Sequence, residues 1–240
     1  MPNSFDEAIE RFWIGRDRQA TRQRESGHSD QGSRGAVTGG GHLDALRDFV
    51  ARIFVTNGIA ESNIHRTSGI TLPGFYRPSK KWDLVVVEDD VLVAAIELKS
   101  QVGSFGNNFN NRTEEAIGNA VDIWRAFEGG AFGAVRPWLG YVFVLEDTEG
   151  SSEPVSIPNM KFEPDSVFLG ASYKERYAIL CERLVRERLY DAVWFVTTSA
   201  VTMKSDQPKA GLRIDDFGAA IAGRAAQVAA LRGRRRPGSH

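Results

Sequence analysis

The residues best suited to chemistry stand where one predicted β-hairpin opens. In "WDLVVVEDDVLVAAIELKSQ" (82–101), Asp83 begins the first apolar run, whereas Glu97 and Lys99 end the second. Side chains alternate along a strand, so Glu97 and Lys99 share one face, and the hairpin brings Asp83 close to them. Two carboxylates form a hard-oxygen site suited to Mg²⁺, with the Leu98 carbonyl as a further candidate ligand. Lys99 is placed to orient or deprotonate a water or to stabilise a pentavalent phosphoryl group, so the pattern predicts phosphodiester hydrolysis.

A structural reading of the same residues competes with this one. Glu-x-Lys is common by chance, and an exposed strand end often carries a solvated ion pair. Two further features favour catalysis, namely Asp83 at the start of the hairpin and the unusually apolar runs Leu84–Val87 and Val91–Ile96. Runs of this kind are typical of a central strand pair that is buried on both faces.

The bulk composition is that of an ordinary globular protein. The chain has 240 residues, of which 42% are hydrophobic and 25% charged, enough for one large domain or two small ones. The sequence contains no apolar stretch of membrane-spanning length, and its first residues lack the pattern of a signal peptide. A lone Cys181 excludes an intrachain disulfide and fits a reducing compartment. We therefore expect a cytoplasmic protein.

The net charge is −1, so the chain has no overall positive charge to attract a polyanion. This weighs mildly against a nucleic-acid partner. Arginines nevertheless gather between Arg11 and Arg34, and the end of the chain is basic. The net charge of the chain would not reveal a basic binding face if an acidic metal site elsewhere in the chain offset its charge.

The elements around the hairpin predict an α/β fold. Apolar spacing indicates helices from residue 4 to about 25, from 43 to near Gly58, and then over 116–127, 172–189 and 215–232. Buried strands are expected at 138–147 and 191–200, while 26–42, 71–80 and 100–115 are expected to be loops or connections. Strands separated by a helical crossover indicate a mixed central β-sheet flanked by helices. We expect one domain, 1–240, with N-terminal helices (1–60) packed on a core (61–235).

A family resemblance is carried by three quoted segments. The spacing Asp-(x)13-Glu-x-Lys resembles the PD-(D/E)xK nuclease core, although Trp82 replaces the proline of that name. More specifically, the chain resembles the XhoI family of type II restriction endonucleases in "DQGSRGAVTGG" (30–40), "LPGFYRPSKKWDLVVV" (72–87) and "ELKSQVGSFGNNFNNRTEEAIGNAVDIWRAF" (97–127).

The resemblance implies a Mg²⁺-dependent endonuclease with a restriction-endonuclease-like core. It further implies that a homodimer recognises the palindrome CTCGAG in double-stranded DNA and leaves five-prime overhangs. A two-fold dimer suits a palindromic target, because the symmetry of the site mirrors that of the protein. A cognate methyltransferase is then expected to modify the same sequence.

The Asn-rich segment after the catalytic strand is a candidate DNA reader. Asparagine reads adenine and arginine reads guanine through paired bonds in the major groove. The alternative is a polar loop with Thr113 as a helix N-cap, followed by acids that favour the helix dipole. The family resemblance favours DNA contact for Asn107, Asn108, Asn110, Asn111 and Arg112.

A Gly-rich segment before the second helix is a candidate phosphate contact. Its small residues permit close approach of the backbone, and its donors are Gln31, Ser33, Arg34 and Thr38. The alternative is a flexible connector, and both hold if the segment orders only on DNA. Gln101 lies on the same strand face as the triad and either positions a phosphate or starts the next loop.

Two other functions remain open from the residues alone. A repair or junction-resolving nuclease on this scaffold would read the shape of DNA instead of its sequence. A DNA-binding protein that does not cleave would keep the scaffold, but the intact Asp83, Glu97 and Lys99 speak against it.

Overall fold

The protein is built around one mixed sheet, here in a computed structural model that describes residues 2, 4–25 and 40–235. Its six strands stand in the order β1-β4-β5-β6-β7-β8. Strands β5, β6 and β7 are parallel, whereas β1, β4 and β8 run antiparallel to their neighbours. This confirms the mixed α/β sheet. The strands are β1 (Ile64–His65), β4 (Leu84–Glu88), β5 (Val91–Gln101), β6 (Trp138–Glu146), β7 (Ala192–Thr198) and β8 (Ser205–Asp206).

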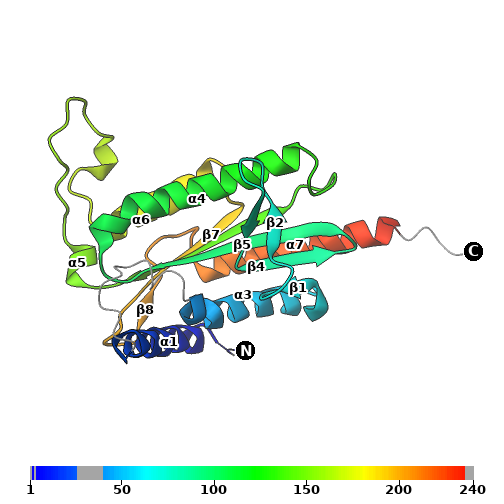
Figure 1. Cartoon of the computed structure of the whole chain (residues 1–240), viewed down its shortest axis with the longest axis horizontal. Coiled ribbons are helices and arrows are strands. Elements are labelled where there is room, and N and C mark those ends of the chain that lie inside the picture. Colours follow the sequence, from blue (N-terminus) through cyan, green and yellow to red (C-terminus); the bar gives the residue numbers. More distant parts are fainter. Residues whose placement is uncertain (1, 3, 26–39, 236–240) are drawn as a thin grey trace, which may run out of the picture.

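Helices cover both faces of the sheet (Figure 1). One apolar cluster joins the sheet to α1 (Phe5–Glu25), α3 (Asp44–Thr56) and α7 (Ile214–Arg235). A second cluster joins the opposite face to α4 (Phe105–Glu128) and α6 (Tyr173–Arg186). The N-terminal helices thus share a core with the sheet. The single domain over 1–240, with its core at 61–235, stays a prediction. Short helical turns complete the chain at η1 (Gly40–Leu43), η2 (Glu61–Asn63), α5 (Glu149–Ser152) and η3 (Ser166–Phe168).

The central hairpin has the register that its sequence favours. Leu84 pairs with Ile96, and the strands are joined at Asp89 and Asp90, whose φ angles are 46° and 60°. Positive φ at both central residues is the geometry of a tight hairpin turn, which aspartate tolerates. Glu88, which follows the predicted apolar run Leu84–Val87, pairs with Val91 as the last residue of β4.

The Asn-rich segment is a helix, so its assignment to a loop was wrong. Helix α4 begins at Phe105 and continues to Glu128 without a break. Phe105 stacks on Tyr173, and Phe109 packs on Tyr177 of α6, with ring centroids 6.1 and 5.1 Å apart. Thr113 does not cap the helix, because its hydroxyl donates to the Phe109 carbonyl inside it. Packing of aromatics four residues apart outweighs the weak helix propensity of the asparagines.

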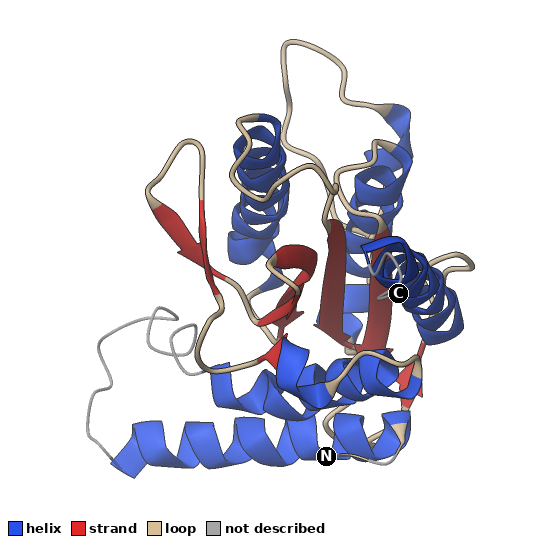
Figure 2. Ribbon diagram, turned by 90° about the vertical axis from the view of Figure 1, so that its right-hand side faces the viewer, coloured by secondary structure: helices blue, strands red, loops and turns tan. Residues whose placement is uncertain are grey.

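The connection before the central hairpin is a hairpin of its own. β2 (Thr71–Pro73) and β3 (Ser79–Lys81) form a separate antiparallel pair, with Pro73 opposite Ser79. Figure 2 shows this pair projecting from the body of the protein. The sequence predicted only a connection at 71–80. Proline lacks an amide donor, but a short edge strand tolerates it, so Pro73 is compatible with this hairpin.

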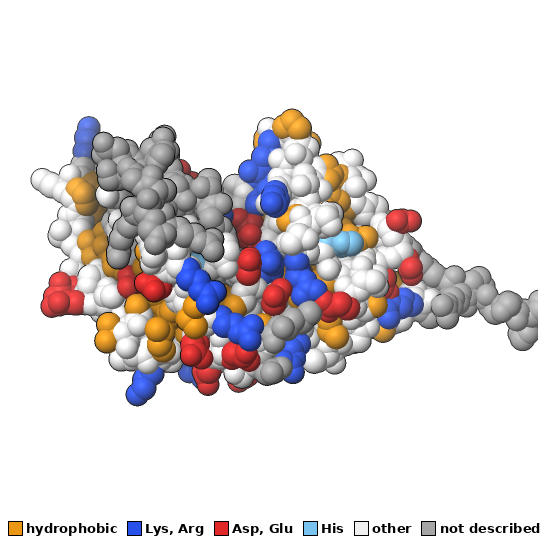
Figure 3. Space-filling model, turned by 60° about the horizontal axis from the view of Figure 1, so that its bottom comes forward, with side chains coloured by type: hydrophobic (Ala, Val, Ile, Leu, Met, Phe, Trp, Pro, Cys, Tyr) orange, Lys and Arg blue, Asp and Glu red, His pale blue; other side chains and the backbone are white. Residues whose placement is uncertain are grey.

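Charges are mixed over the face that carries α1 and α3. Where its side chains are described, Lys, Arg, Asp and Glu are interspersed on this side (Figure 3). None of the helices in the described residues is both long enough and apolar enough to cross a bilayer.

Candidate active site

The open end of the central hairpin brings Asp83 and Glu97 together across two strands. Asp83 immediately precedes β4, and its amide donates to the Ile96 carbonyl at 3.2 Å. Its carboxylate accepts a 2.7 Å hydrogen bond from the Leu98 amide. This bond orients Asp83 towards the strand that carries Glu97. The amide and the carbonyl of a strand residue leave the same side of the strand, so the Leu98 carbonyl also lies on the Asp83 side.

Glu97 is surrounded by donors although it is nearly inaccessible, with 2% of its surface exposed. The Lys99 ammonium lies 2.9 Å from Oε1, as expected for side chains two apart on one strand face. The Lys80 ammonium, which belongs to β3, lies 2.7 Å from Oε2. Asn119 of α4 donates to Oε1 at 3.4 Å. Three elements therefore hold this carboxylate.

The electrostatics of the site follow from burial and from the pairing of like charges. Burial, and then the charge of Glu97, raise the pKa of Asp83 to about 6. The Leu98 amide, Lys99 and Lys80 lower this pKa, but by less. Burial lowers the pKa of Lys99, but Glu97, Glu115 and Asp83 raise it more, so the net shift is upward. Lys99 is thus held as an ammonium beside two carboxylates that disfavour one another's charge.

These donors fit a divalent cation. Two facing carboxylates with a nearby carbonyl are hard-oxygen ligands, and Mg²⁺ characteristically takes one or two carboxylates and completes its shell with waters. A cation between Asp83 and Glu97 would also relieve the repulsion that raises the pKa of Asp83. Within the described ranges, no group of three or more Asp, Glu, His or Cys side chains is placed to hold a metal ion.

A second layer of polar side chains on α4 supports the site. Lys99 also approaches Glu115 at 3.7 Å, and Glu115 in turn accepts a 2.6 Å bond from Arg112. Asn119 accepts a 2.8 Å bond from Arg77, which comes from the tip of the β2–β3 hairpin. Helix α4 therefore links β5 to the projecting hairpin.

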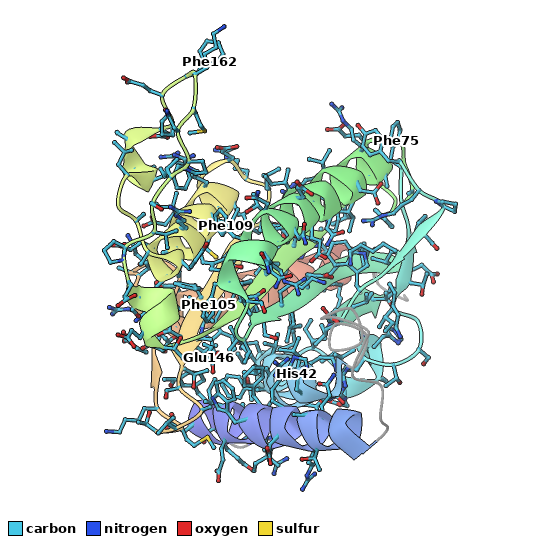
Figure 4. All side chains as sticks on the ribbon, turned by 60° about the vertical axis from the view of Figure 1, so that its left-hand side comes forward. His42, Phe75, Phe105, Phe109, Glu146 and Phe162 are labelled. Atoms are coloured by element: carbon cyan, nitrogen blue, oxygen red, sulfur yellow. The ribbon has the colours of Figure 1, made fainter. Side chains whose placement is uncertain are left out.

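The expected DNA contacts are distributed unevenly. Asn107, Asn110 and Asn111 are exposed on the first turns of α4, and Asn108 is half-buried with its amide on the Ser104 carbonyl. Figure 4 shows these turns beside Phe105 and Phe109. Outside the described residues lie Gln31, Ser33, Arg34 and Thr38.

Gln101 and Arg112 point inward. Gln101 is 4% exposed and donates to the Gly103 carbonyl at 2.6 Å. Arg112 is 8% exposed and ion-paired with Glu115, so a guanine contact would require this pair to open. A base contact for Arg112 stays a prediction.

Lys80 and Asn119 were not predicted from the sequence. Lys80 contacts Glu97 only because residues 71–81 fold back as a hairpin, and no local pattern in β5 predicts that contact. Asn119 lies among Ala116, Ala120 and Ile123 on the buried face of α4. A polar residue on that apolar face was the available signal, because a buried amide requires a partner.

A mixed sheet with two carboxylates and a lysine at the open end of its central hairpin defines a nuclease of the restriction-endonuclease class. The comparisons with known proteins agree. The family model "Restriction endonuclease XhoI" matches residues 22–208, which include the whole candidate site. The chain belongs to the XhoI family of restriction endonucleases, which are DNA-hydrolysing enzymes.

Curated relatives are similar over most of their length. The chain is 42% identical over 191 residues to the type II restriction enzyme BstVI of Geobacillus stearothermophilus, covering 77% of this chain and 82% of that one. It is 47% identical over 150 residues to AbrI of Azospirillum brasilense (61% and 67%), also a type II restriction enzyme. It is 43% identical over 183 residues to the type II enzyme XhoI of Xanthomonas vasicola (74% and 72%). The search of solved structures gave no match.

Proposed function

We propose that this site-specific endonuclease hydrolyses both strands of duplex DNA at CTCGAG, requires Mg²⁺ and leaves five-prime overhangs. The observation that carries the proposal is the cluster of Asp83, Glu97 and Lys99 at the open end of the hairpin, within the residues that the family model matches. The sequence of the target and the position of the cut rest on the family resemblance.

Asp83, Glu97 and the Leu98 carbonyl are the proposed ligands of the Mg²⁺ ion. When bound, the ion supplies Lewis-acid stabilisation of the phosphate charge and makes water a better nucleophile at neutral pH. The Leu98 amide fixes the orientation of the Asp83 carboxylate. Lys80, Lys99 and Asn119 fix that of Glu97. Ligands held by their neighbours in this way need little rearrangement when the cation arrives.

Lys99 is the proposed electrostatic catalyst. Its ammonium lies beside Glu97, 24% exposed, where it can donate to a phosphate oxygen or orient the attacking water. Together with Lys80 it also balances the charges of Asp83 and Glu97, so that a phosphate anion meets no net negative charge from these four groups.

The exposed side of the first turns of α4 is the proposed reader of bases. Asn107, Asn110 and Asn111 present amides there, which suit the adenine edges of the target. The buried Gln101 and Arg112 and the half-buried Asn108 belong to the same proposal as contacts nearer the cleaved bond. The Gly-rich segment contributes phosphate contacts through Gln31, Ser33, Arg34 and Thr38.

The remaining parts of the proposal concern partners. A homodimer would present two copies of the site to the two strands of the palindrome. A cognate methyltransferase would protect the host DNA at the same sequence, in the cytoplasm where both enzymes meet it.

The test is cleavage of two short duplexes, one with CTCGAG and one with a single base pair changed. With Mg²⁺ the first should be cut in both strands and the second should stay intact, and end-sequencing should map five-prime overhangs. EDTA should stop cleavage. Ca²⁺ should allow binding with little cutting, because its longer and looser coordination positions the reacting groups poorly.

Three results would contradict parts of this proposal. Equal cutting of the two duplexes would refute the target sequence. Nicking confined to branched DNA would favour a junction-resolving nuclease, and binding without cleavage under any metal would favour a non-cleaving protein.

A further inference from the structure

Two large aromatic side chains stand exposed at the tip of the β2–β3 hairpin. Phe75 is 58% exposed and Tyr76 is 67% exposed. Their rings meet edge to face, with centroids 5.0 Å apart. Exposed aromatic pairs on a projecting tip are unfavourable in water unless they bind something, so the tip has the character of a contact site.

The backbone of the tip is braced by one buried carboxylate. Asp122 of α4, 4% exposed, accepts the amides of Phe75 and Tyr76 at 2.9 and 2.8 Å. Its other oxygen accepts the Arg77 guanidinium at 2.8 Å. Although burial opposes its charge, these donors hold the pKa of Asp122 below its ordinary value. The rings therefore stand on a preorganised turn.

The turn also needs a glycine at its base. A Cβ on Gly74 would lie 2.6 Å from the Asp122 carboxylate and 2.7 Å from the Arg77 carbonyl, closer than atoms can approach. The backbone thus passes directly over the brace. A tight fit of this kind keeps the direction of the two rings fixed relative to α4.

The brace connects the tip to the candidate active site. Arg77 donates to Asn119 at 2.8 Å, and Asn119 donates to Glu97 at 3.4 Å. From the same hairpin, Lys80 reaches Glu97 directly. A molecule held at the catalytic carboxylates is therefore within reach of the projecting rings.

The charge of the hairpin indicates the chemistry of its partner. Residues 71–81 include three cations and no acid. Lys80 is half-buried against Glu97, but Lys81 is exposed. The Arg77 side chain stays 42% exposed although it pairs with Asp122. Cations beside exposed rings suit a polyanion with stackable bases better than a second copy of this chain. Aromatic and apolar side chains that enter a duplex partly unstack a base step and kink the DNA, while basic neighbours contact the phosphates.

We infer that Phe75 and Tyr76 form a rigid wedge that enters duplex DNA between base pairs beside the cleaved bond. The inference rests on the proposed function, which it deepens by assigning a site for distortion of the DNA. Insertion of the two side chains unstacks one base-pair step, and the bases of that step then stack on the rings of Phe75 and Tyr76. Because the turn is braced before DNA arrives, little ordering of the protein opposes binding.

The test places the fluorescent base 2-aminopurine at successive positions of a CTCGAG duplex, in Ca²⁺ to allow binding without cutting. Wild-type protein should raise its fluorescence at one step, because an unstacked base loses quenching by its neighbours. Phe75→Ala and Tyr76→Ala should each bind about tenfold more weakly, the order of one base–aromatic contact. The double variant should abolish the signal, whereas Phe75→Trp should retain it.

A matched control is available in Phe162. It is 79% exposed and stands on a separate projection (Figure 4). Phe162→Ala should keep both the affinity and the fluorescence change. Thermal unfolding of every variant should match wild type, because the altered rings are exposed.

Several outcomes would overturn the wedge. One is a double variant that binds with wild-type affinity and signal, and another is an equal loss in Phe162→Ala. A third is loss of self-association of the tip variants in sedimentation without DNA, which would make the tip a contact between two chains. Binding and cleavage by wild type without any fluorescence change would refute the wedge and leave the proposed function standing, whereas a wild type that binds no DNA refutes both.

Discussion

The β4–β5 hairpin carries a buried glutamate at each end, and the two have opposite surroundings. At the turn end, Glu88 is 7% exposed and receives the Arg232 guanidinium on both oxygens, with Asn63 donating at 3.2 Å. At the open end, Glu97 is 2% exposed and is shared by the ammonium groups of Lys80 and Lys99.

The difference separates a structural carboxylate from the one proposed to be catalytic. A guanidinium matches a carboxylate with two parallel bonds, so Glu88 forms a closed pair of one anion and one cation. Glu97 instead faces another carboxylate, Asp83, whose charge is disfavoured by burial and by the charge of Glu97. Such an arrangement opposes stability, and it is typical of a site prepared for a cation and a substrate. Burial of a glutamate alone does not distinguish the two.

The largest expected effect tests this division directly. Glu97→Gln, Asp83→Asn and Lys99→Ala should each lower the single-turnover cleavage rate by several powers of ten, because each removes a group that acts on the phosphate. Glu88→Gln should cleave at a rate close to wild type once bound. The measurement is quenched-flow cleavage of a CTCGAG duplex at saturating protein, with circular dichroism to check folding.

Similar behaviour of the Glu88 and Glu97 variants would contradict this division of roles. A folded Glu88→Gln protein that binds DNA but loses cleavage as Glu97→Gln does would show that both ends serve catalysis. Wild-type rates in any one of the three site variants would remove that residue from the proposed mechanism.

The sequence predicted much of the open end and little of the turn end. Asp83, Glu97 and Lys99 are joined by strand alternation and one short turn, so local rules place them together. The partner of Glu88 lies 144 residues away on α7, and no local pattern connects the two. The same limit hid Lys80, whose position depends on how a separate hairpin folds against β5.

The start of α4 shows a different limit. Its asparagines and glycine have the composition of a loop, and a helix was predicted only over 116–127. The four-residue spacing of Phe105 and Phe109 has meaning only once Tyr173 and Tyr177 of α6 are placed against them. Tertiary packing therefore set the beginning of this helix against its local propensity.

A smaller effect would sharpen the account of Glu97. Lys80→Ala should lower the cleavage rate about ten- to a hundredfold, since removing one ammonium leaves a desolvated carboxylate less well held. Lys81 is the matched control, because it is the next residue of β3 and is exposed. Lys81→Ala should affect binding through salt-dependent phosphate contact at most, with its cleavage rate unchanged. Equal cleavage rates for Lys80→Ala and Lys81→Ala at saturating protein would show that Lys99 alone is enough to hold Glu97 in place.

The smallest expected effect concerns stability and should differ in sign between the two ends. Glu88→Gln should lower the free energy of unfolding by about 1–2 kcal/mol, because it weakens a charge-assisted pair whose guanidinium is partly exposed. Asp83→Asn should raise it by up to about 1 kcal/mol, because one of two facing carboxylates loses its charge. Urea unfolding with EDTA at roughly neutral pH, above the pKa of about 6 of Asp83, measures both changes. Destabilisation by Asp83→Asn as large as that by Glu88→Gln would mean that the Leu98 contact outweighs the repulsion, and that the open end is also built for stability.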